Sequence, residues 1–362
     1  MASVYRSLNI QFTRGQKMSS SDFTIIGENI HTTRVLMRNG RRIGKNKDGA
    51  EAILYRGFSG DESFMTIPDH FKETQVYQEG RVKHFMVAVR KGMSEIVDDQ
   101  REGEDYILAE IKRQEGCGSD FLDLNIDELS YELEVQKQAM TWLVGFYSAV
   151  ASVPPSIDSS SSDILKAGLE EYSARGQPQG PPLVNSASFE RVEVLDLVAE
   201  HETHVIVTAA GSSNMPSDEF ERVHNAQLML NHCESIKIAK KRIHVDPLLF
   251  PIAVDQTFGN HYLTSVQLMR KEFGNEVRIS GGLSNVSFGL PARRLINDTF
   301  IRLAMEAGTN SGIVNPVESR IERVMSLDMN SERVKIAKNM LLGEDEFCMN
   351  FIKSFREGKL TE

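Results

Sequence analysis

The sequence has no long hydrophobic run, few cysteines and no excess of positive charge. No apolar stretch approaches the roughly 18–20 residues that a membrane-spanning helix needs. The 3 cysteines lie far apart, which argues against a disulfide framework or a zinc site and is typical of a reducing compartment. Lys+Arg total 41 against 51 for Asp+Glu, and phosphate backbones repel a chain with a formal net charge of −10. We therefore expect a cytoplasmic protein that binds neither membranes nor nucleic acids.

Short β-branched runs alternate with longer amphipathic stretches along the 362 residues. We expect eight strands, at residues 23–27, 121–124, 155–157, 183–184, 204–207, 242–245, 277–280 and 311–314. Eight β–α units at this length favour a closed parallel barrel over an open sheet. The sequence therefore predicts a single α/β domain, a (β/α)8 TIM barrel over residues 23–362. A flexible N-terminal tail (1–22) precedes it, and a long insertion (about 33–93) follows the first strand.

Acidic and amide side chains stand where most of these strands end. They include Glu28, Asp123, Asn125, Asp158, Asn185, Asp246, Asn285 and Asn315. A single Asp or Asn in such a place is most often a helix N-cap or a turn former. N-caps use Ser and Thr as freely, however, so this many at equivalent places indicates a shared site. Strand ends of a β/α barrel converge on one face, where the side chains form a ring that suits a flat, nitrogen-rich heterocycle.

Six segments carry a resemblance to a known family: GENIH (27–31), FLDLNID (121–127), SIDSSSSDILKAGLE (156–170), LVNSAS (183–188), HVDPLLFPI (244–252) and GGLSNVSFGLPARRLINDTF (281–300). They occur in the order seen in the pterin-binding methyltransferases. The chain resembles the methyltetrahydrofolate–corrinoid methyltransferases and the folate-binding module of cobalamin-dependent methionine synthase. It is more distantly similar to dihydropteroate synthase. The resemblance implies an enzyme that moves a methyl group between N5 of tetrahydrofolate and the cobalt of a corrinoid.

The resemblance also implies a role for each matched residue. Asn285 matches the catalytic residue that reaches the pterin N5. The residues that match or accompany the pterin-binding set are Asp158, Asn185, Asp246, Asp123, Asn125 and Glu28. The first-strand motif departs from the family's GERIN, because Asn29 and His31 stand at its Arg and Asn positions. Phe288 stands where some members carry Gln.

The implied cofactors are tetrahydrofolate and a corrinoid. No DxHxxG segment of a histidine-bearing corrinoid module occurs, so we expect the corrinoid to arrive on a separate corrinoid protein, and we expect no bound metal. The family habit suggests a homodimer. Two alternatives stay open: a dihydropteroate synthase-like condensing enzyme, and a non-catalytic pterin-binding subunit of a methyltransferase complex.

A basic run opens the predicted insertion. It contains no acidic residue among positions 34–47 and consists of Arg34, Arg38, Arg41, Arg42, Lys45 and Lys47. The simplest interpretation is a solvated loop or hairpin. Because the run follows the first strand, it should rise from the active-site face. The other hypothesis is therefore contact with a polyglutamate tail, a corrinoid phosphate or an acidic partner.

Overall fold

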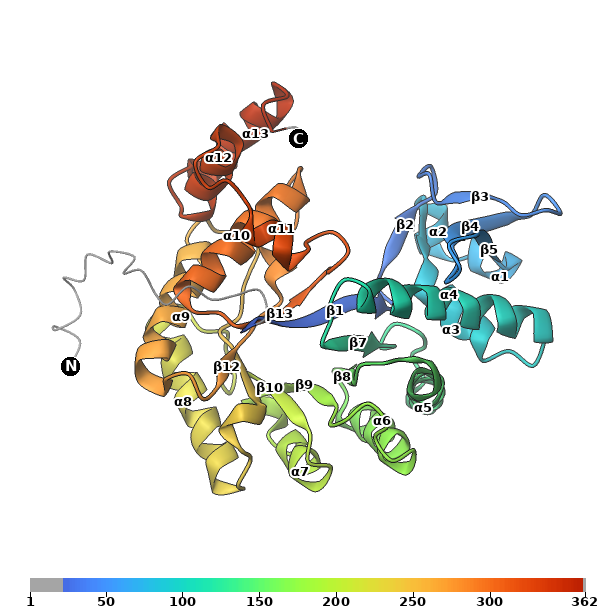
Figure 1. Cartoon of the computed structure of the whole chain (residues 1–362), viewed down its shortest axis with the longest axis horizontal. Helices are drawn as coiled ribbons and strands as arrows, with labels where there is room; N and C mark the ends of the chain where they lie inside the picture. The colour runs from blue at the N-terminus through green and yellow to red at the C-terminus, as the bar shows by residue number, and fades with distance from the viewer. Residues whose placement is uncertain (1–21, 361–362) are drawn as a thin grey trace.

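Eight parallel strands form the centre of the molecule in the computed structural model, which describes residues 22–360 (Figure 1). The strands are β1 (Thr24–His31), β7 (Phe121–Asn125), β8 (Pro155–Asp158), β9 (Leu183–Ala187), β10 (His204–Thr208), β11 (Ile243–Asp246), β12 (Arg278–Ile279) and β13 (Ser311–Val314). They are ordered β12-β11-β10-β9-β8-β7-β1-β13, and a bridge between Gly282 and Ile313 links the two ends. This nearly closed (β/α)8 barrel confirms the predicted fold.

Helices cover the outside of the barrel. Those between strands are α4 (Val97–Glu115), α5 (Leu133–Val150), α6 (Ser162–Ala174), α7 (Val194–Glu200), α8 (Glu219–Ser235), α9 (Phe258–Phe273) and α10 (Arg293–Ala307). The chain continues through α11 (Ile321–Met325), α12 (Glu332–Leu341) and α13 (Met349–Arg356). Short 3-10 turns are η2 (Phe189–Arg191), η3 (Lys240–Arg242), η4 (Leu283–Ser287) and η5 (Glu346–Cys348). No helix in residues 22–360 combines the length and the apolar composition that crossing a membrane requires.

Alternation along the strands separates two cores. Side chains that point outward, such as Leu122, Ile157 and Val205, are fully buried beneath the helices. Inside the barrel, a small apolar cluster made of Ile26, Phe121, Leu183 and Ile206 fills the amino-terminal half. Two residues further along the same strands the inward positions are polar, as Glu28 follows Ile26 and Asp123 follows Phe121. The polar positions therefore form a layer directly above an apolar layer inside the barrel.

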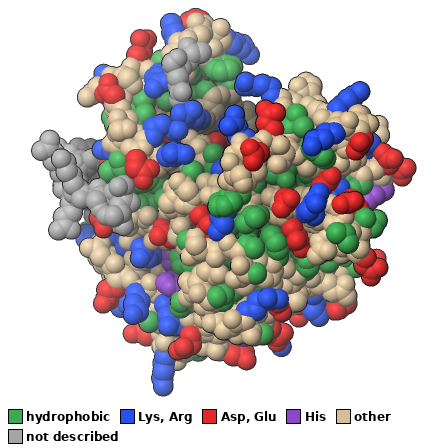
Figure 2. Space-filling view, turned by 45° about the vertical axis from the view of Figure 1, so that its right-hand side comes forward, with side chains coloured by type: hydrophobic (Ala, Val, Ile, Leu, Met, Phe, Trp, Pro, Cys, Tyr) green, Lys and Arg blue, Asp and Glu red, His purple; other side chains and the backbone are tan. Residues whose placement is uncertain are grey.

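Residues between β1 and α4 form a second layer on one side of the barrel (Figure 1). This insertion contains β2 (Val35–Met37), β3 (Ile43–Lys45), β4 (Glu51–Arg56), β5 (Glu62–Thr66), α1 (Asp69–Lys72), α2 (Gln75–Gln78), β6 (Arg81–Lys83) and α3 (His84–Gly92). β2 pairs with β6, and β3, β4 and β5 form an antiparallel sheet. Figure 2, turned toward this side, shows Lys, Arg, Asp and Glu interspersed with hydrophobic patches. The segment is thus folded structure rather than one long loop.

The first strand extends to His31, beyond the predicted end at residue 27. Its pairing with β7 shifts register between Gly27 and Ile30, and then continues to His31 opposite Asn125. Glu28 consequently lies within the strand, and Asn29 turns toward α4. The tail predicted at residues 1–22 lies outside the described residues except for Asp22.

Candidate functional site

Four of the predicted binding residues form one hydrogen-bonded cluster at the carboxyl ends of β7, β8 and β9. The Asp123 carboxylate accepts hydrogen bonds from Ser156 Oγ at 2.6 Å and from Asn185 Nδ2 at 3.3 Å. The Asp158 carboxylate accepts one from Asn125 Nδ2 at 2.9 Å. Because these strands are parallel neighbours in register, with Asn125 opposite Asp158 and Asp158 opposite Asn185, the three ends meet at one level. We call this set the carboxylate cluster.

Burial disfavours the ionised forms of both acids in the carboxylate cluster. It raises the pKa of Asp158 to about 6. It also raises the pKa of Asp123 well above its usual range, with a further contribution from the negative charge of Asp158. A ligand that presents N–H donors would compensate for the lost hydration. The cluster is therefore suited to a ring edge that donates hydrogen bonds.

Asp246 supplies a further carboxylate at the end of β11. Its Oδ1 accepts a hydrogen bond from the backbone N–H of Leu248 at 2.7 Å, and burial raises its pKa to about 6. Gly281 beside it has a φ of +157°, and a Cβ there would lie 3.3 Å from Asp246 Oδ1 and 3.1 Å from the Tyr262 ring. Glycine thus keeps the approach to Asp246 open.

Asn285 lies on η4, the turn that follows β12. Its side chain is half-buried, and within the described part of the chain its amide makes no hydrogen bond. Arg293 braces the turn, since Nε donates to Ser287 Oγ at 2.9 Å and Nη2 to the Ser284 carbonyl at 3.1 Å. The structure thus fixes the backbone of the turn and leaves an amide donor free.

Glu28 connects three parts of the molecule. Its Oε1 accepts a hydrogen bond from Ser284 Oγ at 3.0 Å and forms an ion pair with Arg34 Nη2 at 2.8 Å. Arg34 also donates to the Glu28 carbonyl from Nε and Nη2, at 3.2 Å and 3.0 Å. The carboxylate therefore links β1, the start of the insertion and the turn that bears Asn285. Its direct contact with substrate stays a prediction, and these links make a positioning role the alternative.

Two residues at the site were not among the predicted binding residues. His31 Nε2 lies 3.5 Å from Asp158 Oδ2, and burial lowers the pKa of its imidazole. Asp127 accepts hydrogen bonds from Ser159 Oγ at 2.6 Å and from the N–H and Oγ of Ser160, both at 2.8 Å. The signal for Asp127 was the serine run after β8, whose hydroxyl and amide donors need a nearby acceptor.

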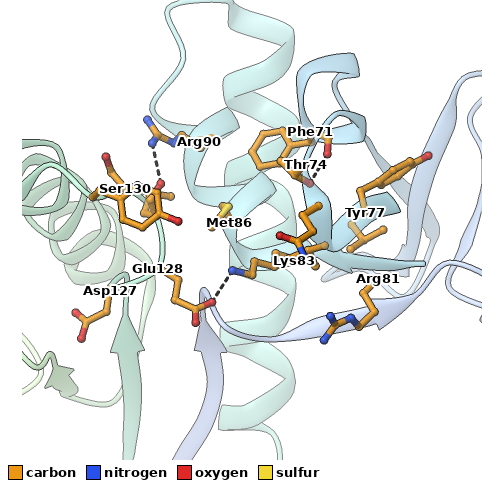
Figure 3. Close-up of a pocket in the computed structure, with 15 residues that line it drawn as sticks. Phe71, Thr74, Tyr77, Arg81, Lys83, Met86, Arg90, Asp127, Glu128 and Ser130 are labelled. Carbon is orange, nitrogen blue, oxygen red and sulfur yellow. Dashed lines mark hydrogen bonds and ion pairs between the residues drawn. The ribbon is translucent and has the colours of Figure 1, made fainter. Parts of the chain in front are cut away.

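A cavity of about 590 Å³ lies beside this site, between the insertion and the loop that follows β7 (Figure 3). Lys83 reaches across it from β6 to form an ion pair with Glu128 at 2.7 Å. Arg90 of α3 donates to the Leu129 carbonyl at 2.8 Å. Asp127 lines this cavity and also binds the loop that follows β8. The cavity therefore adjoins the barrel mouth at Asp127. In residues 22–360, no three His, Cys, Asp or Glu side chains are grouped in a way that could hold a metal ion.

Comparison with known protein families shows to which family the barrel belongs. The family model described as pterin binding enzyme matches residues 93–315. This chain belongs to the pterin-binding enzymes. The matched span runs from the end of α3 to the residue after β13, so it contains the carboxylate cluster, Asp246 and Asn285 and leaves out most of the insertion. Membership in the family confirms the resemblance that the sequence motifs carry.

Two curated relatives are similar over the same region. The methylcorrinoid:tetrahydrofolate methyltransferase of Eubacterium limosum is 28% identical over 232 residues, which cover 63% of this chain and 79% of that protein. The methionine synthase of Mycobacterium leprae is 28% identical over 239 residues, 61% of this chain but only 19% of that much longer protein. The second likeness is therefore to one region of a larger enzyme.

Solved structures confirm the fold alone. A dihydropteroate synthetase with a bound product superimposes with a TM-score of 0.51 at 15% identity and covers 63% of this chain and 88% of that one. Dihydropteroate synthase from Clostridium difficile gives 0.50 at 15% identity, with 62% and 87% covered. Both likenesses cover under two thirds of this chain.

Proposed function

We propose that this chain is a methyltransferase that moves a methyl group between N5 of tetrahydrofolate and the cobalt of a corrinoid carried on a partner protein. The observation that carries the proposal is the kind of side chain gathered at the carboxyl ends of the barrel strands. Buried carboxylates stand at the ends of β8 and β11, and the unbonded amide of Asn285 lies on the turn that follows β12, the neighbour of β11. The names of the two relatives, a methylcorrinoid:tetrahydrofolate methyltransferase and a methionine synthase, support this reaction class.

The carboxylates would hold the substrate through its amino-pyrimidine edge. That edge carries a ring N–H and an exocyclic amine, which donate two parallel hydrogen bonds to one carboxylate. Asp246 and Asp158 each retain acceptor positions, since the structure uses only part of each carboxylate. Asn185 would add an amide contact to the same edge. The pterin would thereby be fixed with N5 turned toward β12.

Asn285 would act on the nitrogen that bears the methyl group. An amine anion is a poor leaving group, and N5 gains electron density as the carbon–nitrogen bond breaks, so displacement needs a donor that stabilises this charge. A hydrogen bond from Asn285 Nδ2 that shortens in the transition state would supply part of that stabilisation. In the reverse direction the Asn285 side-chain oxygen would accept the hydrogen bond of N5–H, which leaves the N5 lone pair free for the incoming methyl group. The corrinoid cobalt supplies the methyl acceptor or donor in this chemistry.

Exposed apolar side chains around the mouth fit a docking partner. They come from four loops that follow barrel strands, and are Tyr131, Met215, Val254 and Phe288, which are 108%, 63%, 76% and 47% exposed. Scattered apolar side chains alone are ordinary, but four on loops of one barrel face suit a transient protein contact. We propose the corrinoid protein as that partner. We also propose a homodimer, which light scattering of the purified chain would test.

An anaerobic absorbance assay tests the reaction. Methyl transfer between methylcobalamin and tetrahydrofolate is measured in both directions by following the cobalt absorbance spectrum. The proteins compared are the wild type, Asn285→Ala and the surface control Asn231→Ala. Removing one transition-state donor typically costs about 2.7–4 kcal/mol, so we expect a roughly 100-fold or larger fall in kcat for Asn285→Ala with folate affinity nearly unchanged. Wild-type rates in Asn285→Ala would refute the assigned role. Absence of tetrahydrofolate binding in the wild type would refute the function.

A further inference from the structure

A second cavity, of about 470 Å³, lies between the β3–β4–β5 sheet and α4. Its charged lining consists of four guanidinium groups and two carboxylates: Arg41, Arg42, Arg56, Arg113, Glu62 and Glu110. We call it the arginine pocket. Its volume is within the range of small-molecule sites, and none of the residues assigned to the pterin site lines it.

The positive charge of the arginine pocket is only partly neutralised. Glu110 is already engaged, because it pairs with Arg113 Nη2 at 2.6 Å and accepts from Asn29 Nδ2 at 2.9 Å. Arg41 and Arg56 are exposed, and no carboxylate of residues 22–360 forms an ion pair with either. Unpaired arginines are well suited to binding carboxylates or phosphates, because the planar guanidinium donates two parallel hydrogen bonds. The pocket therefore favours an anion with more than one charge.

The back of the pocket is aromatic. The Tyr55 and Tyr106 rings meet edge to face with centroids 4.9 Å apart, and Arg42 donates a hydrogen bond to Tyr106 Oη. Tyr106 Oη is also 2.8 Å from His84 Nδ1. Burial, followed by the charges of Arg42, Arg34 and Arg113, holds the pKa of His84 well below its usual range. His84 is therefore neutral at physiological pH, and the arginines carry the charge of this region.

Polar contacts link residues around the arginine pocket to the barrel mouth. Arg34, one of the cations near His84, forms the ion pair with Glu28 in β1. Asn29, which binds Glu110 of the pocket, also donates to Asn315 Oδ1 at 3.0 Å, just beyond β13. These contacts place the arginine pocket on the β1–β13 side of the mouth. An anionic group that leaves the mouth on that side would be attracted to the unpaired arginines of the pocket.

We propose that the arginine pocket receives the carboxylate end of the tetrahydrofolate substrate, and that it selects forms with several glutamates; this rests on the proposed function. With the amino-pyrimidine edge at β8, β9 and β11 and N5 facing η4, the substituent on C6, the carbon next to N5, leaves toward β13 and β1. That side continues into the insertion. The substituent ends in glutamate carboxylates, which are the groups that unpaired arginines bind. Longer glutamate chains reach further and meet more of the guanidinium groups.

Equilibrium binding tests the proposal with three ligands: a tail-less tetrahydropterin, tetrahydrofolate with one glutamate, and tetrahydrofolate with four. The test variant is Arg41→Gln with Arg56→Gln. The control is Lys45→Gln with Lys47→Gln, which changes the net charge equally in the same basic run but outside the pocket lining. We expect the wild type to bind the four-glutamate form at least tenfold more tightly than the one-glutamate form. The arginine variant should reduce that ratio to about twofold without changing the affinity for the tail-less pterin.

The outcomes separate this inference from the function. Equal wild-type affinities for the two folates, with normal pterin binding, overturn the inference and leave the methyltransferase proposal intact. A ratio that survives in the arginine variant, or that falls equally in the lysine control, also overturns it. Failure of all three ligands to bind overturns the proposed function. A preference that weakens between 50 and 300 mM salt would agree with a contact between charged groups.

Discussion

The barrel mouth and the insertion differ in almost every physical respect. The mouth is lined by acids and amides on buried parallel strands, whereas the insertion presents arginines on a half-exposed antiparallel sheet. The acids of the mouth have raised pKa values because they are buried, as in Asp158 and Asp246. Arg41 and Arg56 of the insertion are, by contrast, exposed to water. The difference agrees with the proposal that the barrel binds an uncharged ring and that the insertion binds a charged group.

The two regions are joined by several polar contacts and one close helix pair. The polar contacts include those of Glu28 with Arg34, Lys83 with Glu128 and Arg90 with the Leu129 carbonyl. The helix pair is α3 with α4, where Gly103 approaches the backbone of Ala88 and Gly92. Because each contact joins a single pair of residues, substitutions at one contact at a time should separate the contribution of each region.

Asp246→Asn should produce the largest effect, on the barrel side. The amide keeps an acceptor for Leu248 N–H but loses the charge-assisted pair of hydrogen bonds to the pterin edge. At about 1.5–3 kcal/mol for hydrogen bonds to a charged group, we expect roughly 100-fold weaker binding of tetrahydrofolate, measured by fluorescence titration. The surface variant Asp196→Asn is the matched control. An unchanged dissociation constant for Asp246→Asn would remove Asp246 from the site.

Gly103→Ala should disrupt the junction between the regions. A Cβ at this position would lie 2.3 Å from Gly92 N and 2.5 Å from the Ala88 carbonyl oxygen, so α3 and α4 would have to separate. Overpacking of this kind typically costs about 1–3 kcal/mol of unfolding free energy. Urea unfolding measures the loss, with Gly116→Ala, at the solvent-exposed end of α4, as the control. Equal stability of the two variants would mean that the close approach is not required.

Glu28→Gln should give a smaller effect that distinguishes positioning from substrate binding. The amide can still accept from Ser284 Oγ but loses the ion pair with Arg34. We expect kcat to fall about tenfold, because the turn that bears Asn285 loses part of its support, while folate affinity changes little. Arg34→Gln should reproduce the change, because it removes the same ion pair. A fall in affinity without a change in kcat would favour direct contact between Glu28 and the substrate.

The barrel was predictable because the sequence pattern of each β–α unit is local and is repeated along the chain. Short β-branched runs alternating with amphipathic stretches indicated eight parallel strands, and acidic and amide residues stood where most of them end. Parallel topology then brought the strand ends together, so that Asn125, Asp158 and Asn185 could be expected to meet before any coordinates were known. The structure brings these residues into one cluster, although their roles in binding remain predictions.

The insertion was not predictable in the same way. Its strands are as short as three residues, and the arginine pocket depends on tertiary packing of Tyr55 and Arg41 against α4. Nothing in the basic run indicates which residues of a later helix will face it. The second partner of Glu28 was hidden for a similar reason, because Ser284 lies 256 positions away. Such contacts between segments distant in sequence have no periodic signal.

The pH dependence of folate binding should give the smallest and most diagnostic effect. The pKa values of Asp158 and Asp246 are raised to about 6, so protonation below that pH removes the acceptors that the pterin edge needs. Between pH 7.5 and 5.5 the affinity should fall about fourfold for each carboxylate that must be ionised.

The stability of the unliganded chain should change in the opposite direction over the same pH range. A raised pKa in the folded state contributes stability at low pH, and this stability is lost as the pH rises through 6. Asp158→Asn should remove the contribution of Asp158 to the pH dependence of both affinity and stability. The affinity of the arginine pocket for glutamate should change little over this range, because guanidinium groups stay charged. A wild-type affinity that is flat from pH 7.5 to 5.5 would exclude ionised Asp158 and Asp246 from ligand binding and would leave the contacts at the insertion as the main source of affinity.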